Sequence, residues 1–332
     1  MKKVLALLLT ALLVFGLVGC GNDTVDNTTS ADTTSKEAAP LANANVYTLK
    51  GPTGMGLAPL MDKSENGTAS GTYSFNIAST PDEIVAAISS GSADIASCPL
   101  NLASTLYKKT GGAVKLVSVN TLGVMYILSS DENIKEFADL EDKKIAATGQ
   151  AATPEYIINY LLSKNDMQCE VEYTADPAEL VTLAVSGDAQ IVMLPEPNVS
   201  TAMAKNDKLH IVADLSKEWE KVSDTKLAQS GIIVRADYLE NNKEAVENFL
   251  KEYKESVDFV NTNTAEAAAL IEKFEIVPNA KIAEKAIPNC NIVFIDGQEM
   301  KDIAAANLQV LFDANKAAVG GEMPSDEFYS IK

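Results

Sequence analysis

The sequence predicts an α/β fold of two similar lobes, each with a mixed, mainly parallel sheet, joined by two crossover strands. Three observations support this prediction. The chain contains an internal repeat, each copy alternates strands with helices, and an apolar stretch follows each copy. Alternating strands and helices are typical of parallel sheets covered by helices on both faces.

The internal repeat occupies residues 81–105 and 177–201. The two segments read PDEIVAAISSGSADIASCPLNLAST and PAELVTLAVSGDAQIVMLPEPNVST, and they share 10 of 25 residues without a gap at an offset of 96. Upstream, TGMGLAP at residues 53–59 matches TGQAATP at residues 148–154, at an offset of 95. A repeated unit of this length predicts two lobes of the same architecture.

Each copy predicts a strand, a TG turn, a helix, a second strand, a second helix and a short third strand. The first copy supplies VYTLKG, GLAPLMDK, YSFNIAS, PDEIVAAISSG and ADIAS, and the second supplies KKIAATG, TPEYIINYLLSK, CEVEYTA, PAELVTLAVSG and AQIVML. A glycine after each middle helix is the expected C-terminal stop, and Thr153-Pro154 suits a helix start. The C-terminal third has helical periodicity.

Two apolar stretches predict the crossovers between the lobes. VKLVSVNTLGVMYILSS follows the first copy, and QSGIIVRADYL follows the second. We therefore assign residues 46–125 and 235–332 to lobe 1 and residues 126–234 to lobe 2. Two crossovers form a hinge about which lobes can close around a ligand.

The first 45 residues predict a lipid-anchored protein. MKK, a short apolar run and Cys20 are typical of a secretory signal peptide over residues 1–20. The stretch Leu17-Val18-Gly19-Cys20 resembles the bacterial lipobox, whose cysteine is diacylated; the alternative is an ordinary signal peptide with an incidental cysteine. Residues 21–45 have almost no large apolar side chain, so we expect a disordered tether. The mature chain is then expected on the extracytoplasmic face of the cell membrane, held by lipid.

Composition disfavours several functions. The chain has 27 Lys and Arg against 46 Asp and Glu, a formal net charge of −19, which disfavours nucleic-acid binding. Beyond Cys20 it has Cys98, Cys169 and Cys290 without CxxC spacing, so we expect buried thiols and neither a disulfide framework nor a metal site. HExxH, GxSxG and Walker motifs are missing, and the single histidine, His210, lies in a strand-like run. We therefore expect no catalytic residue and no cofactor.

Ligand contacts are expected on the loops that follow the strands. In open α/β sheets, ligands bind beyond the carboxyl ends of the strands, where the two TG turns and the two proline loops lie. The first TG turn lacks a GKS or GxGxxG continuation, so we expect backbone N–H groups there to meet a ligand and not a nucleotide phosphate. The candidate ligand-binding residues are Gly54, Met55, Gly56, Leu57, Ser97, Cys98, Asn101, Asn120, Thr121, Thr148, Gly149, Gln150, Thr153 and Glu196.

Each candidate also has a structural interpretation. The glycine turns can be tight corners, and Ser97 and Asn101 can cap the next helix. Glu196 can accept a hydrogen bond from an amine, amidine or aminopyrimidine if it faces a cleft, or it can be a helix N-terminal charge that faces water. The aromatic side chains available for stacking, each more often core or surface than ligand wall, are Tyr47, Tyr126, Tyr156 and Trp219.

The lipobox, the tether and the repeated lobes together resemble a known family. With the stretches GPTGMGLAPL, GSADIASCPLN, DLEDKKIAATGQAATPEYI, IVMLPEPNVSTAM and SGIIVRADYL, they resemble the substrate-binding lipoproteins of ABC importers in the NitT/TauT-like (nitrate, taurine and sulfonate) group. The resemblance covers residues 46–332 and implies the type II periplasmic-binding-protein fold, with the strand-end loops as ligand contacts. It also implies capture of a small organic solute and its delivery to an ABC permease and ATPase.

The chain departs from an oxyanion-binding pattern. Arg235 is the only arginine, and no lysine lies in the four loops, so a bidentate clamp on nitrate or a simple sulfonate is not expected. An uncharged, zwitterionic or aromatic solute is expected instead. The alternatives are an enzyme on the same scaffold, of the pyrimidine- or menaquinone-precursor type, and a lipoprotein that senses a ligand.

Overall fold

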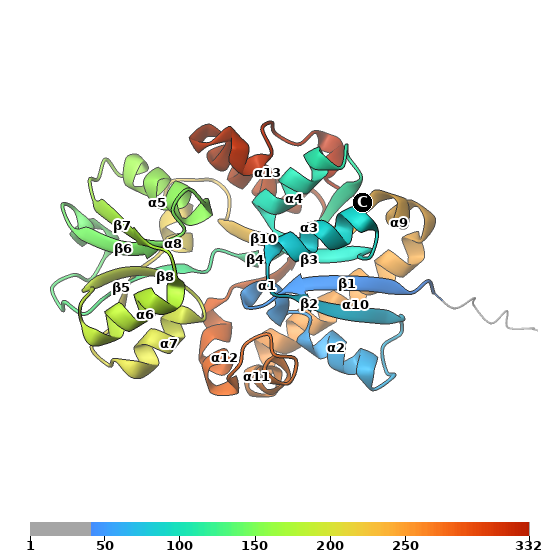
Figure 1. Ribbon diagram of the computed structural model, residues 1–332, viewed down its shortest axis with the longest axis horizontal. Helices are drawn as coiled ribbons and strands as arrows, with labels where there is room; N and C mark the ends of the chain where they lie inside the picture. Colours follow the sequence, from blue (N-terminus) through green and yellow to red (C-terminus); the bar gives the residue numbers. More distant parts are fainter. Residues whose placement is uncertain (1–40, 332) are drawn as a thin grey trace, which may run out of the picture. The chain divides into compact units, whose positions relative to one another are not determined.

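The computed structural model describes residues 41–331, which form one compact unit. The expected signal peptide, the lipobox with Cys20 and most of the tether lie outside the described residues. The strands form two sheets, a six-stranded one in the order β11-β4-β10-β3-β1-β2 and a five-stranded one in the order β7-β6-β8-β5-β9 (Figure 1). The predicted α/β class with two mixed sheets is therefore confirmed.

The first sheet takes its strands from both ends of the described chain. They are β1 (Ala44–Leu49), β2 (Tyr73–Ala78), β3 (Ile95–Pro99), β4 (Val114–Leu122), β10 (Ala228–Arg235) and β11 (Ile292–Ile295). Its helices are α1 (Pro52–Met55), α2 (Ala58–Glu65), α3 (Pro81–Ser90), α4 (Leu100–Lys109), α9 (Ala236–Asn241), α10 (Lys243–Thr262), α11 (Thr264–Lys273), α12 (Ala280–Ala286) and α13 (Gly297–Ala314).

The second sheet is built from one continuous segment. Its strands are β5 (Met125–Ser129), β6 (Lys144–Thr148), β7 (Glu170–Thr174), β8 (Ile191–Pro195) and β9 (His210–Asp214). Its helices are α5 (Thr153–Lys164), α6 (Pro177–Ser186), α7 (Asn198–Lys205) and α8 (Leu215–Glu220). Short 3₁₀ helices lie at Phe137–Leu140, Ile287–Asn289, Lys316–Val319 and Asp326–Phe328.

The sequence repeat is a structural repeat with the same offset of 96 residues. Helices α3 and α6 have equivalent bounds, and so do strands β3 and β8. Both helices end at a glycine with positive φ, 77° at Gly91 and 86° at Gly187, a backbone conformation that glycine adopts without strain. In each sheet, parallel pairing is confined to the three strands of the repeat unit, and the remaining pairs are antiparallel.

The chain passes between the sheets at two places. The first apolar stretch divides into β4 and β5 around Gly123, where an added Cβ would overlap the Ser216 hydroxyl. The second passage lies between α8 and β10, and β10 itself pairs with β3 and β4 in the first sheet. The exact division into lobes stays a prediction.

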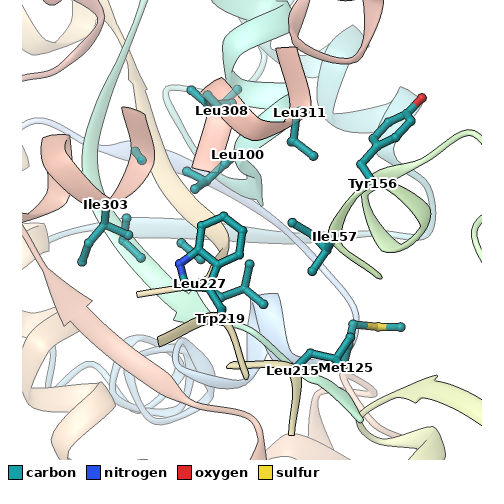
Figure 2. Close-up of a cluster of buried hydrophobic side chains, with 14 of the residues drawn as sticks. Leu100, Met125, Tyr156, Ile157, Leu215, Trp219, Leu227, Ile303, Leu308 and Leu311 are labelled. Carbon is teal, nitrogen blue, oxygen red and sulfur yellow. The ribbon is translucent and has the colours of Figure 1, made fainter. Parts of the chain in front are cut away.

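In the part of the chain that the structure describes, three apolar clusters form the core. One belongs to the first sheet and its α10 face, and one belongs to the second sheet around α6 and α7. The third cluster runs through both halves, because it includes Leu100 and Ile303 from α4 and α13 as well as Ile157 and Trp219 from α5 and α8 (Figure 2). Between residues 41 and 331, no helix is both long and apolar enough to cross a membrane.

Candidate functional site

The α1 turn, which follows β1, is held tightly by its own backbone. The Gly54 and Met55 amides donate to the Gly51 carbonyl at 3.0 and 3.2 Å, and the Leu57 amide donates to the Gly54 carbonyl at 3.0 Å. The Met55 and Leu57 side chains are fully buried in the first-sheet core. In this conformation these three amides are therefore engaged within the turn, and ligand contact by the turn stays a proposal.

Two candidate residues lie beneath the α1 turn and bind its carbonyl group. Ser97 Oγ donates to the Thr53 carbonyl oxygen at 2.9 Å, and Asn120 Nδ2 donates to the same oxygen at 3.2 Å. Asn120 Nδ2 also donates to Ser97 Oγ at 2.6 Å, while Asn120 Oδ1 accepts from Ser230 Oγ at 2.8 Å. All three side chains are buried. This Ser97–Asn120–Ser230 cluster fixes the turn from the carboxyl ends of β3 and β4.

Tyr253 on α10, which was not among the candidates predicted from sequence, completes the support of the turn. Its hydroxyl is buried and has no hydrogen-bond partner among the described residues. A Cβ added at Gly56 would lie 2.7 Å from that hydroxyl oxygen, so Gly56 permits the close approach. Burial raises the pKa of the Tyr253 hydroxyl, and the nearby Asn120 amide opposes this shift.

The TG turn of the second sheet is tied to the C-terminal segment. Thr148 is buried, Gly149 and Thr153 are half-buried, and Gln150 is exposed. The Tyr156 hydroxyl donates to the Ala151 carbonyl at 2.9 Å and accepts from Asn315 Nδ2 at 2.9 Å. The loop is therefore fixed through Tyr156 by a residue that follows α13.

Glu196 directly follows β8 and is only 2% exposed. Its Oε2 accepts from the Ser200 amide at 3.1 Å, and its Oε1 accepts from Ser200 Oγ and Asn289 Nδ2, both at 3.0 Å. Tyr126 Oη donates to the Asn289 carbonyl at 2.8 Å. Burial raises the pKa of the Glu196 carboxyl, while the hydrogen bonds from Asn289 and Ser200 oppose this shift. The carboxylate is at a helix start, as one interpretation expected, but it does not face water.

The other candidates occupy simpler positions. The Cys98 thiol is buried in the cluster shared by both halves, and burial raises its pKa to about 12. Thr121 is buried, and Asn101 is half-buried with its carbonyl accepting from Thr105 Oγ1 at 2.9 Å. The His210 ring contacts the Ile134 carbonyl at 2.7 Å, which suits a structural role. The described cysteines are free.

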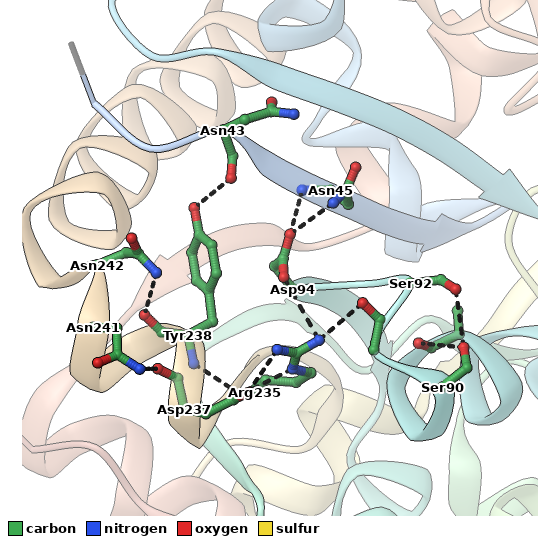
Figure 3. Close-up of polar contacts among 12 residues, drawn as sticks. Asn43, Asn45, Ser90, Ser92, Asp94, Arg235, Asp237, Tyr238, Asn241 and Asn242 are labelled. Carbon is green, nitrogen blue, oxygen red and sulfur yellow. Dashed lines mark hydrogen bonds and ion pairs between the residues drawn. The ribbon is translucent and has the colours of Figure 1, made fainter.

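The single arginine lies at the end of the first sheet that is opposite to the carboxyl ends of β1 and β3. Figure 3 shows its polar contacts. Asp94 precedes β3 and Arg235 ends the antiparallel β10, so both lie away from the carboxyl ends of β1 and β3. Arg235 Nε and Nη2 donate to the Asp237 carboxylate at 2.9 and 2.7 Å, and Nη1 donates to the Gly91 carbonyl at 2.9 Å. Arg235 therefore links β10 to α3 and α9, and it is no clamp for an anion at the strand-end loops.

Solved structures share this arrangement of two sheets. An ABC transporter protein from Parabacteroides distasonis has a TM-score of 0.76 at 22% identity over 87% of this chain and 99% of its own. The periplasmic aliphatic sulphonate-binding protein SsuA from Escherichia coli has a TM-score of 0.65 at 16% identity, over 87% and 93%. The periplasmic nitrate-binding protein NrtA from Synechocystis has a TM-score of 0.56 at 15% identity, over 84% of each chain. The fold is that of the type II periplasmic binding proteins.

The sequence profile of the family described as NMT1/THI5-like matches residues 76–267. Because this match covers more than half of the chain, the chain belongs to the NMT1/THI5-like family. Binding proteins of Brucella abortus and Brucella suis are 24% identical to it over 185 residues. The matched region spans about half of these relatives' length, 56%, and 54% of this chain.

Proposed function

We propose that this protein is the extracytoplasmic solute-binding component of an ABC importer. It captures a small organic molecule between the strand-end loops of its two sheets and delivers the molecule to a membrane permease. Ligand contacts to both halves stabilise the closed arrangement, since only a differential affinity can shift such an equilibrium.

One observation carries the proposal. Glu196, which directly follows β8 of the second sheet, binds Asn289 of the first-sheet half through a 3.0 Å hydrogen bond. Strand-end residues of one half thus meet the other half, as capture between two closing halves requires. The solved neighbours named above are binding proteins or ABC transporter proteins, which supports capture over catalysis.

The proposed solute is uncharged, zwitterionic or aromatic. The strand-end loops carry no lysine or arginine, and Arg235 is engaged with Asp237 and Gly91 at the opposite end of the first sheet. The α1 turn, the buried Thr148 and the Glu196 carboxylate offer backbone dipoles, a hydroxyl group and hydrogen-bond acceptors. A fully charged oxyanion would lack a cationic partner there.

A thermal-shift screen tests capture. The purified chain is heated with purines, pyrimidines, vitamins, aromatic acids and sulfonates. Any solute that raises the melting temperature is then recovered and weighed by mass spectrometry to check that it is chemically unchanged. At least one non-sulfonate solute is expected to raise the melting temperature, because a ligand that binds only the folded state stabilises it. No shift with any solute and no co-purified ligand mass would contradict the proposal; a chemically altered hit would favour an enzyme.

We also propose that Cys20 carries the lipid that holds the protein at the membrane. The proposal rests on the lipobox-like sequence before Cys20. Full-length protein expressed in a bacterium is expected to incorporate labelled palmitate and to sediment with membranes, whereas Cys20→Ser is expected to do neither. Equal labelling of both proteins would overturn the assignment.

A further inference from the structure

The two halves of the molecule contact each other on two sides. One contact is made by apolar side chains, and the other is made by hydrogen bonds. On the side of α5, α8 and α13, one apolar cluster is continuous through both halves. Figure 2 shows Trp219 of α8 among Leu100, Leu227 and Ile303, and Trp219 is only 1% exposed. We call this side the apolar seam.

On the other side, the buried apolar clusters of the two halves are separate within residues 41–331. The cluster around α10 contains residues of the first-sheet half, and the cluster around α6 and α7 contains residues of the second sheet. The side-chain contacts between these two parts are polar: Asn289 Nδ2 donates to Glu196 Oε1 at 3.0 Å, and the Asn289 carbonyl accepts from Tyr126 Oη at 2.8 Å. We call Tyr126, Glu196 and Asn289 the polar latch.

These two contacts differ in what it costs to separate them. Exposing the apolar seam would bring large buried side chains into water, which is unfavourable in proportion to the apolar area exposed. Opening the polar latch exchanges two hydrogen bonds for hydrogen bonds to water, so the net cost is small. Water can therefore enter one side far more easily than the other.

We infer that the halves open at the polar latch and rotate about the apolar seam, so that a solute enters between α7 and the 3₁₀ turn Ile287–Asn289. This inference rests on the proposed capture function. Asn289 then acts as a closing residue: it leaves Glu196 in the open state and returns to it on closure. Tyr126 provides the second attachment point for the same residue.

Hydrogen exchange of the full chain without any solute tests the inference. Tyr126→Phe and Asn289→Ala each remove one bond of the latch, and each is expected to speed amide exchange in residues 196–201 and 287–291 about tenfold. Asn289→Asp places two carboxyl groups in contact and is expected to speed it further. Amides of α5 and α13 are expected to exchange at the parent rate. Trp219, the chain's single tryptophan, is expected to keep its emission wavelength.

Asn315→Ala is the matched control, because it removes a hydrogen bond to Tyr156 on the seam side. It is expected to leave exchange in residues 287–291 unchanged. The inference is overturned if the latch variants leave those amides at the parent rate, or if they speed exchange in α5 and α13 equally and shift Trp219 emission to the red. The exchange experiment contains no solute, so it tests the opening direction alone. If the expected exchange pattern is seen but no solute binds in the thermal-shift screen, the capture function is contradicted and the opening direction is not.

Discussion

Asn120 on β4 holds the turn that follows β1, because its amide nitrogen donates to the Thr53 carbonyl oxygen at 3.2 Å. The same nitrogen donates to Ser97, and the amide oxygen accepts from Ser230, so both ends of the buried side chain are engaged. The position of one strand-end loop therefore depends on a residue 67 positions away in the sequence.

Replacing Asn120 is expected to be costly. Asn120→Ala leaves the buried Ser230 hydroxyl without its acceptor and should lower the free energy of unfolding by about 2–3 kcal/mol, as buried polar groups that lose a partner do. Urea unfolding measures this change. Asn101→Ala, the same substitution at a half-buried residue in the first turn of α4, is the control and should cost less than about 1 kcal/mol. Equal losses would show that the Asn120 network does not stabilise the turn.

Glu196 predicts a pH-dependent effect on stability. Burial holds the pKa of its carboxyl above the ordinary value of 4.5, so the folded chain binds this proton more tightly than the unfolded chain does. The contribution to stability is then fully present below pH 4.5 and is lost as the pH rises through the folded pKa. Relative to the parent, Glu196→Gln should therefore gain stability between pH 4.5 and 7.

Urea unfolding at several pH values checks this expectation. Glu179→Gln makes the same substitution at an exposed position in the first turn of α6 and serves as the control for replacing a carboxylate by an amide. A difference between the parent and Glu196→Gln that did not change with pH would contradict the assigned direction of the pKa shift.

Removing the Tyr253 hydroxyl is expected not to lower stability, because this group has no hydrogen-bond partner among the described residues. Tyr253→Phe keeps the ring packing and removes a buried polar group without a partner, so stability should stay the same or rise by up to about 1 kcal/mol. Tyr238→Phe removes a hydroxyl that donates to the Asn43 carbonyl at 2.9 Å and should instead lower stability by about 1 kcal/mol. Calorimetric melting of both variants distinguishes them, and a loss at Tyr253 as large as that at Tyr238 would indicate a partner for the Tyr253 hydroxyl.

Gly56 and Tyr253 are expected to be energetically coupled. Gly56→Ala would place a methyl group 2.7 Å from the Tyr253 hydroxyl oxygen, and such overpacking should cost about 1–3 kcal/mol. In the Tyr253→Phe background the penalty should fall by at least half, since the overlapping oxygen is gone. A double-mutant cycle measures the coupling, and strictly additive effects would place the strain elsewhere.

The repeated elements were predicted correctly from the sequence. Matching segments at an offset of 96 predicted equivalent elements, and α3, α6, β3 and β8 have those bounds. The two TG turns and Glu196 do lie at strand ends, because their positions follow from the local alternation of strand and helix. Local pattern could not show that the Met55, Leu57 and Cys98 side chains face apolar cores, because orientation depends on what packs against each element.

Residues that act across long distances in sequence were not predicted. Ser230, Tyr253 and Asn289 lie after the repeat, and each binds or approaches one of the predicted candidate residues. None has a neighbour pattern that marks it, since a serine in a strand, a tyrosine in a helix and an asparagine in a turn are ordinary. Their partners depend on how distant strands and helices pack together, and this packing is set only in the folded chain.

Leu100 and Glu196 occupy equivalent positions of the repeat, each immediately after the third strand of its copy. Leu100 is buried in the apolar seam, whereas Glu196 accepts hydrogen bonds in the polar latch. A duplicated unit would by itself produce a symmetric pair of jaws with no preferred side for entry. The difference at this one pair of positions breaks that symmetry. A molecule made of two like parts therefore has one side suited to entry and one side suited to staying closed.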